Sequence, residues 1–191
     1  SGGTSFLAAA EKLFRMFFNN KVSWLLWILY QNSGNCITVA DLTEQFIKAQ
    51  ISFDDVLEIM KSKRIVYAPD STMQAMLSDV YGRTLVIEPG IGYREEQGRY
   101  SVITNYSLMK PESTKNFIVP GDDRYERALQ LLDSYKNEFL LSDAFALLHA
   151  VRQEGVWATR VSFLYSANEQ TVYFIENNRF ENIRKYVFPF A

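Results

Sequence analysis

Cysteine and histidine are nearly missing from this sequence, which has one of each, Cys36 and His149. A single cysteine cannot close an internal disulfide, and no cluster of cysteine and histidine has the spacing of a metal site. We therefore expect neither a metal nor another cofactor. Such sparing use of cysteine fits a reducing compartment, so we expect the protein in the cytoplasm.

The chain also lacks an excess of charge of one sign and a long apolar run. Its 20 basic and 22 acidic residues are mixed along the sequence and give a net charge of −2, without a basic stripe for nucleic acid. The apolar run Val22–Tyr30 is far shorter than the roughly 20 residues that a membrane-spanning helix needs. We expect no nucleic-acid partner and no membrane span, and we interpret the run as a buried helix.

Apolar and aromatic residues, in contrast, are plentiful. Hydrophobic residues make up 48% of the 191 positions and include 14 Phe, 11 Tyr and 3 Trp. This suits one domain with a sizeable core, or one large half of an enzyme, and we expect a single domain over residues 1–191. Residues 1–3 resemble the remnant of a tag, residues 4–63 are expected to be mainly helical, and residues 64–191 are expected to form layers of sheet and helix.

Capping and turn signals divide the first third of the chain into helices. One helix is expected after Ser5 and a second over Trp24–Tyr30. Thr38 or Asp41 begins a third helix, and Ser52 caps a fourth. The spacing of apolar residues predicts which side chains these last two helices bury, namely Val39, Leu42, Phe46 and Ile47 in the third and Val56, Leu57 and Met60 in the fourth.

The middle of the chain has the period of strands. Four are expected, at Arg64–Ala68, Met73–Leu77, Thr84–Glu88 and Tyr100–Thr104, as antiparallel neighbours joined by short turns. The polar stretch between the last two strands is interpreted as a turn. The segment Lys110–Pro120 is expected to be an irregular loop.

The last third returns to helices and ends in strands. Asp122 or Asp123 is expected to cap a helix, and a further helix should begin at Ser142-Asp143. Closing strands are expected at Thr159–Tyr165, Thr171–Ile175 and around Tyr186–Phe188. Helices, then sheet, then helices and sheet again predict a layered α+β domain.

Two polar residues are candidates for a functional site. Asn105 ends the predicted strand Tyr100–Thr104, and a strand that ends on an amide can present it at a sheet edge, where chemistry is often located. The alternative is an asparagine that satisfies a turn. Arg124 lies in the first turn of its helix, where a cation is electrostatically disfavoured, so its position needs a reason. The alternative there is an ordinary ion pair with Asp122, Asp123 or Glu126.

Several segments, taken in order, resemble one known family. They are Leu77-Ser-Asp-Val-Tyr-Gly-Arg-Thr-Leu-Val-Ile-Glu88, Val102-Ile-Thr-Asn105, Pro120-Gly-Asp-Asp-Arg-Tyr-Glu-Arg127 and Thr159–Tyr173, with an apolar helix upstream in Trp24–Val39. Their order and spacing resemble the choloylglycine hydrolases, a group that includes bile salt hydrolases, penicillin V acylases and other linear amide C–N hydrolases. The resemblance spans roughly Val22–Phe188.

This resemblance implies the N-terminal-nucleophile fold, an αββα sandwich in which two antiparallel sheets lie between helical layers. It implies hydrolysis of a small N-acyl amide by an N-terminal cysteine, whose thiolate attacks the carbonyl and whose α-amine acts as the base. Asn105 matches the asparagine of the family's Thr-Asn motif, which donates to the oxyanion. Arg124 matches the first arginine of an Arg-x-x-Arg helix start and would favour the thiolate. Arg127 matches the second arginine and is expected to be structural.

The sequence departs from the family at several positions. The nucleophilic cysteine lies in an N-terminal region that is not part of this sequence, so we expect a preceding segment or a second chain to carry it. Cys36 falls in a turn between helices in the matching register and is not expected to be the nucleophile. Gln74 replaces a histidine common in bile salt hydrolases, and the loop between Asn105 and Arg124 is shorter than theirs. Bile salts and penicillin V are therefore not the expected substrates.

A second class of function stays open beside the hydrolase. A non-catalytic relative would keep the fold as a structural or ligand-binding protein, and the glutamine at position 74 favours this alternative. His149 lies among apolar residues and is expected to be a packed helical residue rather than a catalytic one. The acyl group, the amine and the oligomeric state, a homo-oligomer included, are left open.

Overall fold

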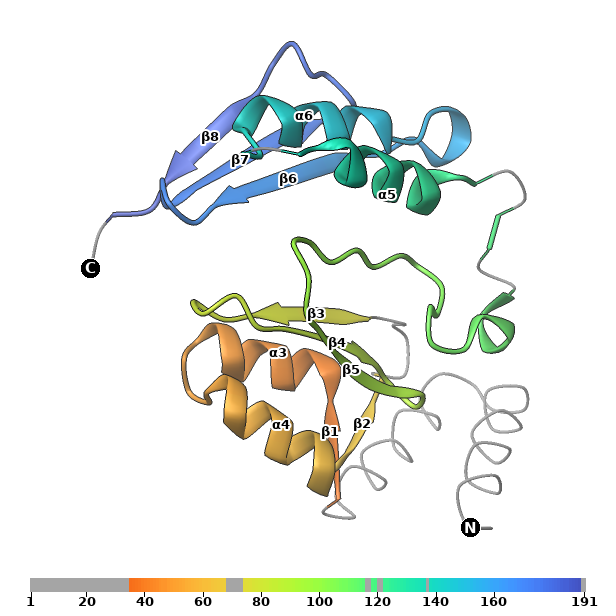
Figure 1. The fold of residues 1–191 in the computed structure, drawn as a ribbon, viewed down its shortest axis with the longest axis vertical. Helices are drawn as coiled ribbons and strands as arrows, with labels where there is room; N and C mark the ends of the chain where they lie inside the picture. The colour runs from red at the N-terminus through yellow and green to blue at the C-terminus, as the bar shows by residue number, and fades with distance from the viewer. Residues whose placement is uncertain (1–34, 68–73, 116–117, 120–121, 137, 190–191) are drawn as a thin grey trace, which may run out of the picture. The chain divides into compact units, whose positions relative to one another are not determined.

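The computed structural model describes residues 35–67, 74–115, 118–119, 122–136 and 138–189 (Figure 1). The chain divides into two compact units, residues 1–117 and 118–191, and each is described here by itself. The helices expected after Ser5 and over Trp24–Tyr30 lie outside the described residues. The single domain expected over residues 1–191 stays a prediction.

The described part of the first unit begins with a strand and continues with two helices, which four further strands follow. In chain order it contains β1 (Cys36–Thr38), α3 (Val39–Ile47), α4 (Phe53–Ser62), β2 (Arg64–Val66), β3 (Ala75–Ser78), β4 (Thr84–Glu88), β5 (Gly92–Glu96) and the short 3-10 turn η1 (Pro111–Ser113). The irregular loop expected over Lys110–Pro120 therefore includes one short helical turn.

Side-chain caps start α3 and α4, the two α-helices described in the first unit, where the sequence predicts. The Thr38 hydroxyl accepts a hydrogen bond from the backbone N–H of Asp41, at 2.9 Å, which settles Thr38 as the cap of α3. Ser52 and Asp55 form a reciprocal capping box at the start of α4. One prediction is wrong: Ile47 is 75% exposed, because it is the last residue of α3 and the chain turns away there.

Strands β1 and β2 form a parallel pair, with Ile37 opposite Ile65. The connection between them runs through α3 and α4, as a parallel pair requires. For the strand expected at Arg64–Ala68 the prediction of an antiparallel neighbour is wrong, whereas the strands expected at Met73–Leu77 and Thr84–Glu88 do pair antiparallel, as β3 and β4. Cys36 lies in a strand and not in the predicted turn between helices. A strand of three residues is too short to show a period, so nothing in the pattern marked β1.

The main sheet of the first unit is antiparallel, in the order β3-β4-β5. The hairpin between β4 and β5 turns at Pro89-Gly90, where Gly90 has a φ of 75° and Ile91 N–H donates to Glu88 O at 3.0 Å. The third strand is therefore Gly92–Glu96, and the expected strand Tyr100–Thr104 is irregular backbone instead. β5 is a polar strand at the sheet edge, so it lacks the apolar alternation that marks a half-buried strand.

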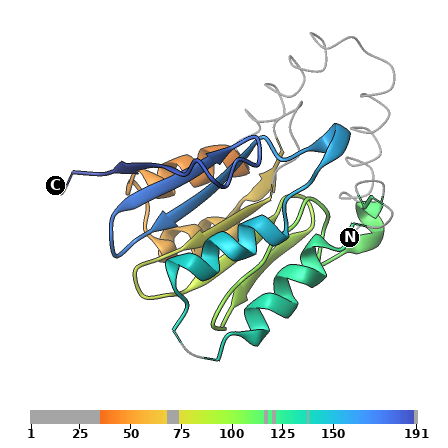
Figure 2. The same cartoon turned by 90° about the horizontal axis from the view of Figure 1, so that it is seen from above.

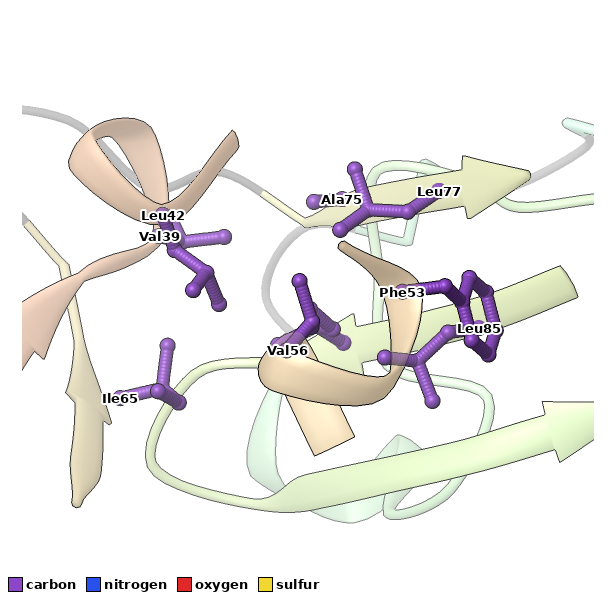
Figure 3. Packing of buried hydrophobic residues seen from close by; sticks show 9 residues of the cluster. Val39, Leu42, Phe53, Val56, Ile65, Ala75, Leu77 and Leu85 are labelled. Atoms are coloured by element: carbon purple, nitrogen blue, oxygen red, sulfur yellow. The ribbon is translucent and has the colours of Figure 1, made fainter. Parts of the chain in front are cut away.

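The core of the first unit lies between the helices and one face of this sheet. Figure 3 shows side chains of α3, α4, β2, β3 and β4 converging there. The buried members of this cluster are Val39, Leu42, Phe53, Val56, Ile65, Ala75, Leu77, Leu85 and Ile87. The alternation of Ala75 and Leu77 with exposed neighbours is that of a strand with one face on the core.

The second unit places two helices on one face of a second antiparallel sheet (Figure 1). Its elements are α5 (Arg124–Ser134), α6 (Leu141–Ala150), the 3-10 turn η3 (Gly155–Trp157), β6 (Val161–Ser166), β7 (Thr171–Glu176) and β8 (Arg184–Val187). The two helices run side by side (Figure 2). Phe145 of α6 meets Tyr173 of β7 edge to face, with ring centroids 5.7 Å apart. The predicted order of helices followed by strands is confirmed.

The opposite face of the second sheet is rich in aromatic side chains. Paired residues of an antiparallel sheet share a face, and the register aligns Phe163 with Phe174 and Tyr165 with Val172 and Tyr186. Phe163 is 66% exposed and Tyr186 57% exposed. We call this surface the aromatic face; its apolar members are Val161, Phe163, Tyr165, Val172, Phe174 and Tyr186. The same register places the ion pair of Arg184 with Glu176, at 3.2 Å, on one end of it.

The protein is thus of mixed α+β class, with two antiparallel sheets and one parallel pair in the described residues. None of the helices in that part of the chain combines the length and the apolar character that crossing a bilayer requires.

Candidate functional site

Asn105 lies in the irregular segment that follows β5, where the chain bends. It does not end a strand, so the reason that first singled it out is wrong. Its side chain is exposed, and its Oδ1 accepts a hydrogen bond from the Thr104 hydroxyl at 3.1 Å. This bond engages the amide oxygen; donation to an oxyanion would have to come from the amide nitrogen, Nδ2.

The residues directly after Asn105 are held by a buried carboxylate, Glu88, at the end of β4. Glu88 is only 1% exposed. It accepts hydrogen bonds from the Ser107 hydroxyl, from Leu108 N–H at 3.0 Å and from Met109 N–H at 3.3 Å. A buried carboxylate without such donors would be strongly destabilising. The three bonds therefore fix residues 107–109 against the end of β4.

Further hydrogen bonds hold the backbone on either side of residues 107–109. The Ser107 hydroxyl accepts from Lys110 N–H at 2.7 Å, and Ser107 N–H donates to the Thr114 hydroxyl at 2.6 Å. Gln74 Nε2 donates to the carbonyl of Tyr106 at 2.8 Å. We call residues 106–110 the anchored segment. Gln74 thus contacts the residue next to Asn105, although the sequence analysis counted this glutamine only as the loss of a histidine.

The burial of this region also affects Tyr67 and the side-chain oxygen of Gln74. Burial raises the pKa of Tyr67, and the charge of Glu88 acts in the same direction. The side-chain oxygen of Gln74 is buried and accepts no hydrogen bond. The amide is therefore held through its nitrogen alone.

Sequence reasoning missed the role of Glu88 and treated it as the end of a strand. One signal was present: the three residues before it, Leu85, Val86 and Ile87, are all apolar, so a carboxylate at the next position needed internal partners. Those partners come from residues 19 to 21 positions further along the chain, and no local pattern indicates them.

Arg124 is the first residue of α5 and is paired with Asp122. Its Nε donates to Asp122 Oδ1 at 2.8 Å and its Nη2 to Oδ2 at 2.7 Å. Asp122 is 7% exposed and Arg124 32% exposed. The hydrogen bond from Arg124 lowers the pKa of Asp122. Of the alternatives left open by the sequence, the ion pair with Asp122 is present.

The predicted cap of α5 is shared between two aspartates. Asp123 occupies the N-cap position without a side-chain capping bond, whereas Asp122 Oδ1 accepts from Arg124 N–H at 3.2 Å. Asp123 instead binds Arg127, whose Nη1 donates to the carbonyl of Ala150 at 2.7 Å. This bond ties α5 to the last turn of α6, which suits the structural role expected of Arg127.

The single cysteine and the single histidine of the sequence lie in β1 and α6. Cys36 is half-buried in β1. His149 is exposed in the last turn of α6, with its ring 4.8 Å from that of Phe180 and its Nδ1 2.8 Å from Arg152 Nη1. It is therefore not the packed residue that the sequence predicted.

Asn105 belongs to the first unit and Arg124 to the second, so the structure describes the surroundings of each separately. Across the described stretches of the chain, no group of three or more His, Cys, Asp or Glu side chains is arranged to hold a metal ion. Comparison with family models, curated proteins and solved structures finds no significant match to this chain.

Proposed function

We propose that this chain is part of a linear amide C–N hydrolase of the N-terminal-nucleophile type, acting on a small N-acyl amide. One observation carries the proposal: Asn105 is exposed, its Oδ1 is engaged by Thr104, and the backbone after it is anchored. An oxyanion donor is effective when it is fixed before the reaction begins, because no reorganisation is then needed in the transition state. The sequence resemblance assigns this role to the same residue.

In the proposed reaction, the thiolate of an N-terminal cysteine attacks the carbonyl carbon of the amide. That cysteine would come from a segment or chain outside this sequence. The electron pair of the C=O bond moves to oxygen, and Asn105 Nδ2 donates to the resulting oxyanion. When the tetrahedral intermediate collapses, the C–N bond breaks and the amine leaves with a proton from the α-ammonium group. Water then hydrolyses the thioester and regenerates the thiol.

Arg124 would act on the nucleophile by favouring the thiolate over the thiol. Its bidentate pairing with Asp122 restricts the guanidinium to one orientation. The proposal requires that Arg124 and Asn105 serve the same nucleophile, which a double-mutant cycle on the rate of hydrolysis would test through non-additive effects.

The proposed fold is the αββα sandwich of N-terminal-nucleophile enzymes. In such a sandwich, the sheet face opposite the helices packs against a second sheet. The aromatic face has the composition of a surface of this kind, because its exposed rings are concentrated on the side of β6–β8 that carries no helix.

The alternative function, a non-catalytic structural or ligand-binding relative, is favoured by one contact. The Asp122 carboxylate already offsets the charge of Arg124, which reduces the stabilisation that this arginine could give a thiolate.

The deciding experiment uses the natural polypeptide, with everything encoded upstream of Thr4. Its mature N-terminus is sequenced, and hydrolysis of a panel of N-acyl amides is measured. The hydrolase requires an N-terminal cysteine and turnover of at least one amide. A mature protein without that cysteine and without turnover would contradict the proposal and leave the non-catalytic alternative.

Asn105→Ala in that enzyme should lower kcat by about 10²–10³-fold, the loss typical of one oxyanion donor. The midpoint of urea unfolding should stay unchanged, because the side chain is exposed. Asn35→Ala is the matched control, since Asn35 is also an exposed asparagine of the first unit. An unchanged kcat in Asn105→Ala would exclude the oxyanion role.

A further inference from the structure

Glu88 is the one carboxylate in an otherwise apolar stretch of β4. Leu85, Val86 and Ile87 before it are all 0% exposed, and Glu88 itself is 1% exposed. An apolar side chain there would continue the buried strand without the free-energy cost of removing a carboxylate from water. The presence of a carboxylate therefore needs an explanation from the groups that it binds.

All three donors that bind Glu88 come from the anchored segment. The Ser107 hydroxyl, Leu108 N–H and Met109 N–H converge on its two oxygens. Gln74 adds a fourth bond, to the carbonyl of Tyr106. Four consecutive residues, 106–109, are thus bound to two side chains of the β3–β4 region, and Asn105 directly precedes them.

The four bonds are not equivalent. Glu88 accepts three bonds from the anchored segment, whereas Gln74 donates one, so Glu88 holds the segment more firmly. The Ser107 hydroxyl also accepts from Lys110 N–H, which closes the turn that Glu88 binds. Loss of Glu88 would remove the acceptor that Ser107, Leu108 and Met109 share, whereas loss of Gln74 would remove only the donor to the carbonyl of Tyr106.

We propose that Glu88 is a positioning residue of the site, with Gln74 as a weaker partner: by binding the anchored segment, it fixes the backbone that carries Asn105 and thereby aims the Asn105 amide at the oxyanion. The inference rests on the proposed function. Glu88 touches no reacting atom, and its effect on catalysis passes entirely through Asn105.

The first test measures amide hydrogen exchange in this chain by NMR, for wild type, Glu88→Gln, Glu88→Ala and Ser107→Ala. Leu108 and Met109 should exchange about tenfold faster in Glu88→Ala, because their acceptor is gone. Glu88→Gln keeps one acceptor oxygen and should rescue part of this protection. Glu95→Gln is the matched control, an exposed carboxylate on the neighbouring strand β5. Unchanged exchange at Leu108 and Met109 in Glu88→Ala would overturn the inference.

The second test measures kinetics in the natural enzyme with its N-terminal cysteine. Glu88→Gln should lower kcat by up to about a hundredfold with little change in KM, the loss that follows from misplacing a reacting group by about 1 Å. In the Asn105→Ala background the same substitution should have almost no further effect on kcat. A purely structural Glu88 would lower kcat by the same factor in both backgrounds, and that result would overturn the inference.

Ser107→Ala keeps the test decisive where a Glu88 variant fails to fold. It removes only the hydroxyl between Glu88 and Lys110 N–H, and it should lower kcat in the wild-type background alone. No turnover by the wild-type natural enzyme would overturn the proposed function and the positioning role together. Normal turnover with unchanged exchange in the Glu88 variants would overturn the positioning role only.

Discussion

The two units of this chain bury their sheets in different ways. In the first, helices α3 and α4 pack on one face of β3–β5, and every residue from Leu85 to Glu88 is buried, so both faces of β4 are covered. In the second, the residues buried among those described are Ala128, Ala144, Thr171 and Ile175, and the aromatic face stays exposed. A sheet with helices on one side and exposed rings on the other has the character of half a layered domain. Among the described residues, the first unit therefore buries a larger apolar core than the second.

The largest expected difference in the free energy of unfolding is between a substitution of a core leucine and a substitution of a ring on the aromatic face. Leu85→Ala should lower the free energy of unfolding by about 2–5 kcal/mol, because Leu85 is 0% exposed. Phe163→Ala in the same chain should cost only about 0.2–1 kcal/mol, the value of its cross-strand pair with Phe174. Urea unfolding of both variants, followed by circular dichroism, measures the two values.

The same two variants, measured in the natural polypeptide, test whether the aromatic face is covered there. If the proposed sandwich covers the aromatic face there, Phe163→Ala should cost about 3–5 kcal/mol, as for a buried ring. An equally small cost in the natural polypeptide would contradict the proposed fold and leave the second unit as a one-sided layer.

Substitutions at the helix N-caps of the two units should change the free energy of unfolding by smaller amounts, and in opposite directions. Ser52→Ala removes the capping box of α4 and should cost about 1 kcal/mol. In the second unit, Leu140 stands at the start of α6, where its N–H donates to Asp143 at 2.8 Å but its side chain offers no acceptor. Leu140→Ser should therefore raise the free energy of unfolding by about 0.5–1 kcal/mol. A loss of stability in Leu140→Ser would show that Leu140 contacts a surface that the cap argument ignores.

The smallest effect is expected for the ion pair of Asp122 with Arg124, which should contribute less than about 1 kcal/mol to the free energy of unfolding. The pKa of Asp122 is lowered in the folded protein, so its contribution is fully present above the ordinary aspartate pKa of about 3.9 and is lost as the pH falls through the lower folded value. Wild type should thus unfold at a higher temperature than Asp122→Asn at pH 7. The gap should shrink below about pH 4. A gap that stays constant into acid would show that the charge of Asp122 does not stabilise the fold.

Local features of the fold could be predicted from the sequence, because each depends on a few neighbouring residues. Ser52 predicts the start of α4 as a capping residue, and Pro89-Gly90 predicts the tight turn that follows β4. The alternation in β6 and β7 likewise predicts the closing hairpin.

The errors arose where a strand depends on its partner rather than on its own pattern. β5 is polar and pairs because the turn at Pro89-Gly90 brings it beside β4. Tyr100–Thr104 contains the apolar pair Val102-Ile103, which is typical of a strand. Among the described residues, however, this segment pairs with no strand. β1 has three residues and is defined by its contact with β2.

The candidate site could be predicted only as two isolated residues. Asn105 was identified for a wrong structural reason, and its anchoring depends on Glu88 and Gln74, which are distant in sequence. Sequence spacing cannot reveal which donors a buried carboxylate will meet, because the turn that carries them has no period. The catalytic roles of Asn105 and Arg124 stay predictions that the kinetic tests address.

The two edges of the second sheet differ in their capacity to recruit another chain. All four residues of β8 are exposed, and two of them are Arg184 and Lys185; charge on an edge strand opposes further strand pairing. β6, the other edge, contains no charged residue and no proline in its sequence Val-Ser-Phe-Leu-Tyr-Ser. A long edge of this composition is a template for ordered aggregation. Phe163→Lys would place a charge on this edge strand and should oppose its pairing with another chain.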